Sequence, residues 1–227
     1  TRLDFAFDER LGYLTSCPSN VGTGMRASVM VHLPGLVLTE QINKVVNAVN
    51  KIGLAVRGLF GEGSEAQSNL FQVSNQTTLG EAEGTILDRL GRVIEQIIHN
   101  ELDARQKLFE ERTDVILDYV GRAYGILRHS RIIASKEALN HLSMIRLGRD
   151  LGLLPAFPPG DAVDLLVMDI QPAHLQFRAG RKLTPEQRDV LRAGVLRERL
   201  QSVPEPAMPP PEGNPPDRPP AGGPPPS

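Results

Sequence analysis

The chain has 227 residues, of which 40% are apolar and 4% aromatic, with 25 basic against 27 acidic side chains. This length allows one ordinary domain or two small ones, with enough chain to bury a hydrophobic core. The near-neutral charge argues against a nucleic-acid binder, because such proteins usually carry a clear basic excess. Apolar runs stay well below the roughly 20 residues of a membrane-spanning helix, so no membrane contact is expected.

One cysteine and the lack of a signal-peptide pattern indicate a reducing, cytoplasmic location. The first residue is Thr1, not Met, and a patterned segment follows at once. We therefore expect the chain to be the downstream part of a longer protein.

Residues 1–80 alternate between strand-like and helical patterns, which predicts a mixed α and β domain. Pro34 and Gly53 are natural stops for a strand and a helix, respectively. A glycine-rich loop follows at Gly61–Glu65. The expected elements are strands at 25–33, 54–59 and 69–74 and a helix at 39–51.

From about Glu81 onward the pattern is helical almost throughout. Ser135 can cap one helix, and Thr184 is a fitting N-cap for the last, with Pro185 at its first position and Gln187 completing a capping box. Apolar residues form one stripe over 86–98, which predicts a first helix there. Further helices are expected at 112–127, from 135 to 148 or 152, and at 184–201.

Proline placement defines the clearest boundary, because 12 of the 19 prolines lie between Pro204 and Pro226. Such a segment cannot bury enough apolar surface to offset its ordering entropy, so we expect a disordered tail at 204–227. A proline-rich ligand for a partner domain is the alternative. Without the tail, the chain has 24 basic and 24 acidic residues and no overall field to steer partners.

The stretch from Leu11 to Val29 is the most informative. It is typical of a strand, a tight turn with one thiol, Cys17, at its entrance, and a strand leading away with Arg26 on its polar face. Exposed N–H groups in the Gly-Thr-Gly turn suit an anion, and Arg26 would add a bidentate contact. The alternatives are an ordinary hairpin and a cysteine that serves as a small buried hydrophobe.

A second cluster sets Arg57 at a strand end and two carboxylates, Glu62 and Glu65, in a glycine-lined loop. Glycines at 58, 61 and 63 allow the backbone to approach a ligand closely. A flexible, solvated hairpin loop is the alternative.

Together the two clusters resemble the catalytic domain of the phosphagen (guanidino) kinases. The Cys-Pro-Ser-Asn-x-Gly-Thr stretch at 17–23 is similar to that family's signature, and Arg-Gly-x-x-Gly-Glu follows at 57–62. The match is closer to the bacterial protein arginine kinases of the McsB type, because Gly63 stands where small-molecule kinases usually have His. The resemblance covers about residues 3–201. Further matching segments are 73–76, 79–80, 124–127, 135–138, 146–152 and 171–172.

The resemblance implies an α+β fold. It predicts an antiparallel-sheet catalytic domain without its N-terminal part, then a helical C-terminal domain and a disordered tail. Only 16 residues precede Cys17, so the chain corresponds to roughly the downstream two-thirds of such a kinase. Three parts are expected. Residues 1–80 form part of the catalytic domain, and residues 204–227 form the tail. Residues 81–203 form a helical region that includes both the end of the catalytic domain and a phosphoarginine-binding or dimerisation domain.

Phosphorylation of arginine needs help, because guanidinium stays protonated with a pKa above about 12 and is a poor nucleophile. The resemblance implies that Glu62 orients the attacking nitrogen and takes its proton, with Cys17 as a thiolate beside it. Arg26 and Arg57 match the family's phosphate-binding arginines, and ATP with Mg²⁺ bound through the nucleotide is the implied donor. The residues that shape the supporting turn are Asn20, Gly22 and Thr23.

A further match is Arg188-Asp189-x-x-Arg192-Ala193, similar to a motif that contributes a phosphoarginine pocket in protein arginine kinases. Arg188 and Arg192 are four residues apart, so on a helix they can converge on an anion. The alternative is a solvated basic face, since more arginines follow. Arg192 is expected to be an exposed helix residue whose removal costs little stability.

The leading hypothesis is a protein arginine kinase that transfers the γ-phosphoryl group of ATP to protein arginines. The resemblance implies that this marks clients for an ATP-dependent protease in stress response, with a zinc-finger activator protein as partner and a homodimer as a candidate assembly. The alternative is a truncated, inactive phosphoarginine-binding or dimerisation module. A kinase for free arginine or creatine is disfavoured by Gly63 and the helical C-terminal region.

Overall fold

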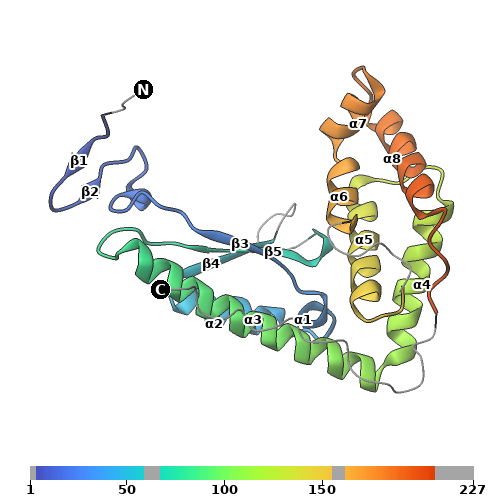
Figure 1. The fold of residues 1–227 in the computed structure, drawn as a ribbon, viewed down its shortest axis with the longest axis horizontal. Coiled ribbons are helices and arrows are strands. Elements are labelled where there is room, and N and C mark those ends of the chain that lie inside the picture. The colour runs from blue at the N-terminus through green and yellow to red at the C-terminus, as the bar shows by residue number, and fades with distance from the viewer. Residues whose placement is uncertain (1–3, 59–66, 155–161, 208–227) are drawn as a thin grey trace, which may run out of the picture.

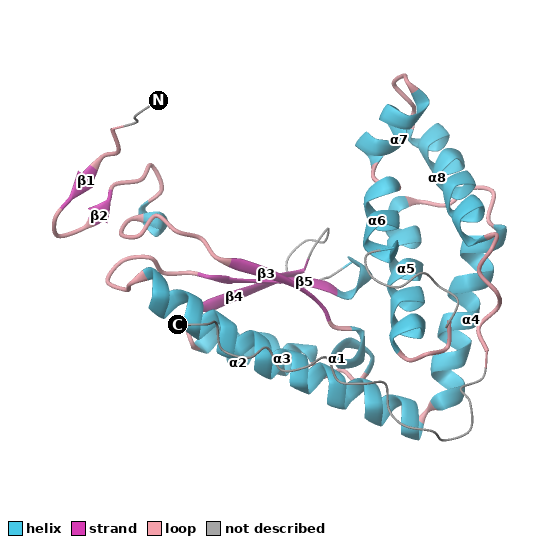
Figure 2. Ribbon diagram, viewed as in Figure 1, coloured by secondary structure: helices cyan, strands magenta, loops and turns pink. Residues whose placement is uncertain are grey.

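The structure is a computed structural model in which residues 4–58, 67–154 and 162–207 are described. It is mostly helical, with a two-stranded hairpin and a three-stranded antiparallel sheet (Figures 1 and 2). The expected mixed α and β class with an antiparallel sheet is confirmed. The glycine-rich loop at 61–65 and most of the proline-rich tail lie outside the described residues.

The sheet has the strand order β3-β5-β4, with both pairs antiparallel. Side chains at alternate positions point to opposite faces, so Val31 of β3 and Phe71 and Val73 of β5 are buried against helices, whereas Met30 is exposed on the other face. The predicted strands are confirmed, with bounds that differ by at most three residues at each end. The strands are β1 (Phe7–Asp8), β2 (Gly12–Tyr13), β3 (Ser28–His32), β4 (Leu54–Gly58) and β5 (Leu70–Asn75).

Three helices, α1 (Pro34–Leu38), α2 (Ile42–Lys51) and α3 (Glu83–Glu111), cover the buried face of the sheet (Figure 1). The single helix expected at 39–51 starts later than predicted, because Glu40 has a positive φ of 58° and separates α1 from α2. Pro34 ends the strand as predicted, but it also occupies the first turn of α1, where its missing N–H costs nothing.

The C-terminal domain comprises α4 (Thr113–His129), α5 (Ser135–Asp150), α6 (Ala162–Asp169), α7 (Pro172–Ala179) and α8 (Pro185–Leu200). The capping box of α8 is confirmed, because Gln187 N donates to the Thr184 hydroxyl and the Gln187 side chain accepts from Thr184 N. The Ser135 cap is wrong: α5 begins at Ser135 itself, and its N-cap position has no side-chain bond.

Two hydrophobic cores lie side by side, one between the sheet and α1–α3 and one within α4–α8. Helix α3 contributes to both, with Leu90 and Ile94 in the first core and Leu108 in the second. Its 29 residues run beneath the whole sheet to the base of α4 (Figure 1). No helix within 4–58, 67–154 and 162–207 is both long and apolar enough to cross a membrane.

A buried ionic cluster joins the two cores. Glu101 on α3 is 4% exposed and accepts hydrogen bonds from the backbone N–H groups of Gly35 (2.8 Å) and Leu36 (2.9 Å) at the start of α1. It also accepts from Arg105 Nε, and the same guanidinium donates to Asp150 on α5 at 3.0 Å. Burial raises the pKa of Glu101, although Arg105 and the two N–H groups act in the opposite direction.

Candidate active site and basic pocket

The turn that carries Cys17 is held against the chain segment that follows β5. Tyr13 and Gly22 exchange backbone hydrogen bonds of 2.7 and 3.2 Å, which closes the turn. The Thr78 hydroxyl donates to the carbonyl of Val21 at 2.7 Å. Gly22 has φ 112°, and a Cβ there would lie 2.3 Å from the Thr78 carbonyl oxygen, so only glycine fits this position.

Cys17 is exposed and stands at the start of the short 3₁₀ turn η1 (Pro18–Asn20). Its Sγ lies 3.0 Å from the Ser19 hydroxyl. Hydrogen bonding to the Ser19 side chain, then to the Ser19 backbone, lowers the pKa of the Cys17 thiol, and the charge of Arg26 adds to this. The reading of Cys17 as a small buried hydrophobe is therefore wrong, and the lowered pKa favours the thiolate. Ser19 was missed as a site residue, although it stands within the Cys-Pro-Ser-Asn stretch.

Asn75, at the end of β5, fixes the segment between the turn and β3. It is 1% exposed; its Oδ1 accepts from Ala27 N at 2.8 Å and its Nδ2 donates to the carbonyl of Met25 at 3.1 Å. These two bonds flank Arg26 in the sequence and so hold its backbone in place. Asn75 belongs to the matching segment at 73–76, but no role was predicted for it.

Arg26 and Arg57 are both exposed, and within the described residues neither side chain has a hydrogen bond or ion pair. Arg57 is opposite Gln72 in the β4–β5 register, and Gln72 Nε2 donates to the Ser28 hydroxyl at 3.1 Å. The polar face of the sheet thus carries Arg57, and Arg26 lies two residues before Ser28. Both cations lack a partner among the described residues, and guanidinium groups of this kind can bind phosphate.

Glu62 lies outside the described residues, so its approach to Cys17 stays a prediction. Among the other predicted turn residues, Asn20 ends η1 and its backbone N–H donates to the Cys17 carbonyl at 2.9 Å. Thr23 N donates to the Thr78 carbonyl at 3.1 Å. Both therefore support the turn.

The Arg-Asp-x-x-Arg-Ala motif lies in the first half of α8. Arg192 is 1% exposed, and its guanidinium donates to the carbonyls of Ile133 (2.9 Å) and Ile170 (3.2 Å) and to the Asp189 carboxylate. The expectation that Arg192 is exposed is therefore wrong, because the motif faces the segment before α5 and the end of α6. Arg188 is half-buried and donates to the carbonyl of Leu183 at 2.9 Å.

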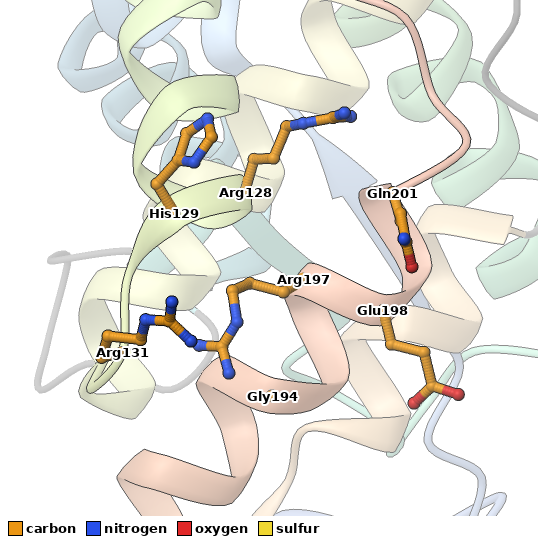
Figure 3. Close-up of a pocket in the computed structure, with 7 residues that line it drawn as sticks. All are labelled: Arg128, His129, Arg131, Gly194, Arg197, Glu198 and Gln201. Atoms are coloured by element: carbon orange, nitrogen blue, oxygen red, sulfur yellow. The ribbon is translucent and has the colours of Figure 1, made fainter.

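A basic pocket of about 430 Å³ opens between the end of α4 and the second half of α8 (Figure 3). Arg128 is held by the carbonyls of Leu200 (2.7 Å) and Val203 (2.9 Å), and Arg197 by that of Ser130. Arg131 is exposed, and its side chain has no partner in the part of the chain that the structure describes. The residues that line the pocket are Arg128, His129, Arg131, Gly194, Arg197, Glu198 and Gln201. The pocket begins one residue beyond Ala193, so it adjoins the motif.

Comparison with known protein families identifies the class of protein to which the chain belongs. Residues 1–104 match the family model described as "ATP:guanido phosphotransferase, C-terminal catalytic domain". Residues 113–210 match a second model, "Protein-arginine kinase McsB C-terminal domain". The chain therefore belongs to the protein-arginine kinases of the ATP:guanido phosphotransferase family, as its Cys17 and Arg57 motifs predicted.

Curated relatives agree with this assignment. The chain is 54% identical over 200 residues to "Protein-arginine kinase" of Halalkalibacterium halodurans and 55% identical over 201 residues to that of Brevibacillus brevis. Each match covers 88% of this chain but 56% of the relative, so the chain spans about half the length of these relatives. A solved lombricine kinase is 35% identical over 43% of this chain and 26% of its own, with a TM-score of 0.37.

Proposed function

We propose that this protein transfers the γ-phosphoryl group of ATP to arginine side chains of proteins. The observation that carries the proposal is the exposed Cys17 thiol, whose pKa is lowered by Ser19. Two exposed arginines, Arg26 and Arg57, support it, because neither has a partner among the described residues. A thiolate attracts and aligns the guanidinium of the acceptor, whereas Arg26 and Arg57 attract the phosphates of the donor.

The reaction forms an N–P bond at the acceptor arginine and breaks the bond between the γ-phosphorus and its bridging oxygen, so that ADP leaves. The acceptor nitrogen loses one proton, and the resemblance assigns that proton to the Glu62 carboxylate. Mg²⁺ bound through the nucleotide would neutralise charge on the phosphates. This chain's own contribution is therefore to orient both substrates and to remove the proton.

The remaining parts of the proposal concern the cell. The protein would modify cytoplasmic proteins with exposed arginines and thereby mark them for an ATP-dependent protease, with a zinc-finger activator as partner and a homodimer as a candidate assembly. Support comes from the relatives' name, protein-arginine kinase, which implies a protein acceptor.

Phosphoryl transfer by this chain is testable with matched variants. With ATP, Mg²⁺ and an arginine-rich protein, Glu62→Gln is expected to lower kcat about 10²–10⁴-fold, the usual contribution of a general base. Cys17→Ser and Arg57→Ala should each lower it at least about tenfold, and Arg92→Ala, at an exposed arginine on α3, should leave it unchanged. Acid-labile phosphate on the protein is the readout. No transfer by the unaltered chain, or full activity of Glu62→Gln, would refute the proposal.

A second function, phosphoarginine binding by the C-terminal domain, is favoured by the basic pocket that adjoins the Arg188-Asp189-x-x-Arg192-Ala193 motif. Arg188 does not line the pocket itself, but the resemblance assigns the first arginine of the motif to the phosphate. Arg188→Ala is therefore expected to weaken phosphoarginine binding at least about tenfold. Calorimetric titration with free phosphoarginine measures this. Arg181→Ala, at an exposed arginine in the loop before α8, is the control. Unchanged affinity in Arg188→Ala would remove the motif from the binding site.

A further inference from the structure

Helix α5 of the C-terminal domain contacts the catalytic sheet at the turn η2 (Gln67–Asn69), which leads the chain into β5. Ser68 and Asn69 have φ values of 61° and 53°, in the left-handed region. Residues with a side chain rarely adopt this conformation, and they keep it where the surrounding structure holds them. The structure must therefore supply contacts that fix this turn.

Two side chains of α5 supply them. Asn140 Oδ1 accepts from the backbone N–H of Ser68 at 2.9 Å, and the Ser143 hydroxyl accepts from Asn69 Nδ2 at 2.9 Å. Ser68 and Ser143 are 3% and 4% exposed, so the contact is shielded from water. Both left-handed residues are thus bonded to α5.

The same serine reaches the neighbouring strand. Ser143 Oγ lies 2.8 Å from His32 Nε2 at the end of β3, and the backbone of Leu33 donates to the Asn69 carbonyl at 2.9 Å. Burial, followed by the charges of Arg105, Arg146 and Arg149, lowers the pKa of His32 well below its ordinary value. His32 is therefore a neutral partner of Ser143 near neutral pH, and α5 is tied to two strands at once.

The turn stands at one end of residues 59–66, which carry Glu62. At the other end, Gly58 is paired with Phe71 in the β4–β5 register. Ser68 follows Glu62 by six positions, a span of at most about 20 Å of extended chain. A change in the conformation of Ser68 therefore changes the point from which this segment starts.

We propose that Asn140 and Ser143 are positioning residues for phosphoryl transfer, which act by fixing the Ser68–Asn69 turn at the end of the segment that carries Glu62. The inference rests on the proposed kinase function. It makes the C-terminal domain part of the catalytic apparatus, in addition to any role in binding phosphoarginine.

The kinetic test uses the full chain with Asn140→Ala and Ser143→Ala. Each is expected to lower kcat about tenfold, the rate equivalent of one lost hydrogen bond, with KM for ATP within about twofold of the unaltered chain. Asn140→Asp keeps an acceptor oxygen for Ser68 N and should restore most of kcat. Asn47→Ala, at an exposed position of α2, is the matched control.

A second readout does not depend on activity. Hydrogen exchange at the Ser68 amide should accelerate at least about tenfold in Asn140→Ala and return in Asn140→Asp. Unchanged exchange overturns the inference, and so does faster exchange with unchanged kcat. If the unaltered chain transfers no phosphoryl group, the proposed function fails, and exchange at Ser68 alone then decides whether Asn140 fixes the turn.

Discussion

Replacement of Glu101 by alanine is expected to lower the free energy of unfolding by about 3–5 kcal/mol, the usual cost of breaking a buried ion pair by removing one partner. The change leaves Arg105, itself only 12% exposed, with Asp150 as its remaining carboxylate. It also leaves the N–H groups of Gly35 and Leu36 without acceptors at the start of α1. A loss of this size is a large fraction of the stability of an ordinary domain.

Urea titration followed by circular dichroism measures this effect. Glu95→Ala, at an exposed position of the same helix, should change stability by no more than about 0.5 kcal/mol. Because burial raises the pKa of Glu101 despite Arg105, desolvation of the pair offsets much of its attraction. Replacing both Glu101 and Arg105 by Met should therefore cost less than the sum of the single changes. A loss below about 1 kcal/mol in Glu101→Ala would show that the carboxylate does not support α1.

The elements that were predicted correctly are those whose signals are local. Strand alternation within five or six residues defines β3 and β5, because the two faces meet different surroundings. The capping box of α8 depends only on Thr184 and Gln187, three residues apart. Gly53, with φ 76°, ends α2 because a left-handed residue there closes the helix.

The elements that were missed depend on contacts between distant residues. Helix α1 has only five residues, and the carboxylate of Glu101, about 65 positions later, accepts from two of its first N–H groups. No local pattern could indicate this. The same holds for the active-site turn: Cys17 was found from its motif, whereas Thr78, which holds the turn, lies 57 residues from its partner Val21.

Arg192 is different, because a sequence signal for its burial existed. Leu196 and Leu200 follow it at intervals of four residues, and both are fully buried. Arg192 therefore continues the apolar stripe of α8, which faces the C-terminal core. Its charge, together with the neighbouring Arg188, led instead to the expectation of an exposed basic face.

Arg192→Ala is expected to lower the free energy of unfolding by about 2–4 kcal/mol, because it leaves the buried carbonyls of Ile133 and Ile170 without donors and opens a cavity. The Asp189 carboxylate, which is 30% exposed, also loses its partner. Arg192→Lys should recover little, since one ammonium group cannot reproduce the planar fork that reaches all three acceptors. Thermal unfolding of both variants measures the loss.

Arg188→Ala separates binding from stability at this motif. Its guanidinium reaches only the Leu183 carbonyl among the described residues, so its removal should cost no more than about 1 kcal/mol. If Arg188→Ala weakens phosphoarginine binding at least about tenfold while its free energy of unfolding falls by no more than about 1 kcal/mol, the first arginine of the motif contacts the ligand. The second arginine then acts by holding α8 against α6 and the segment before α5. An unchanged midpoint in Arg192→Ala would contradict this division, because a buried guanidinium with three hydrogen-bond partners cannot be lost without cost.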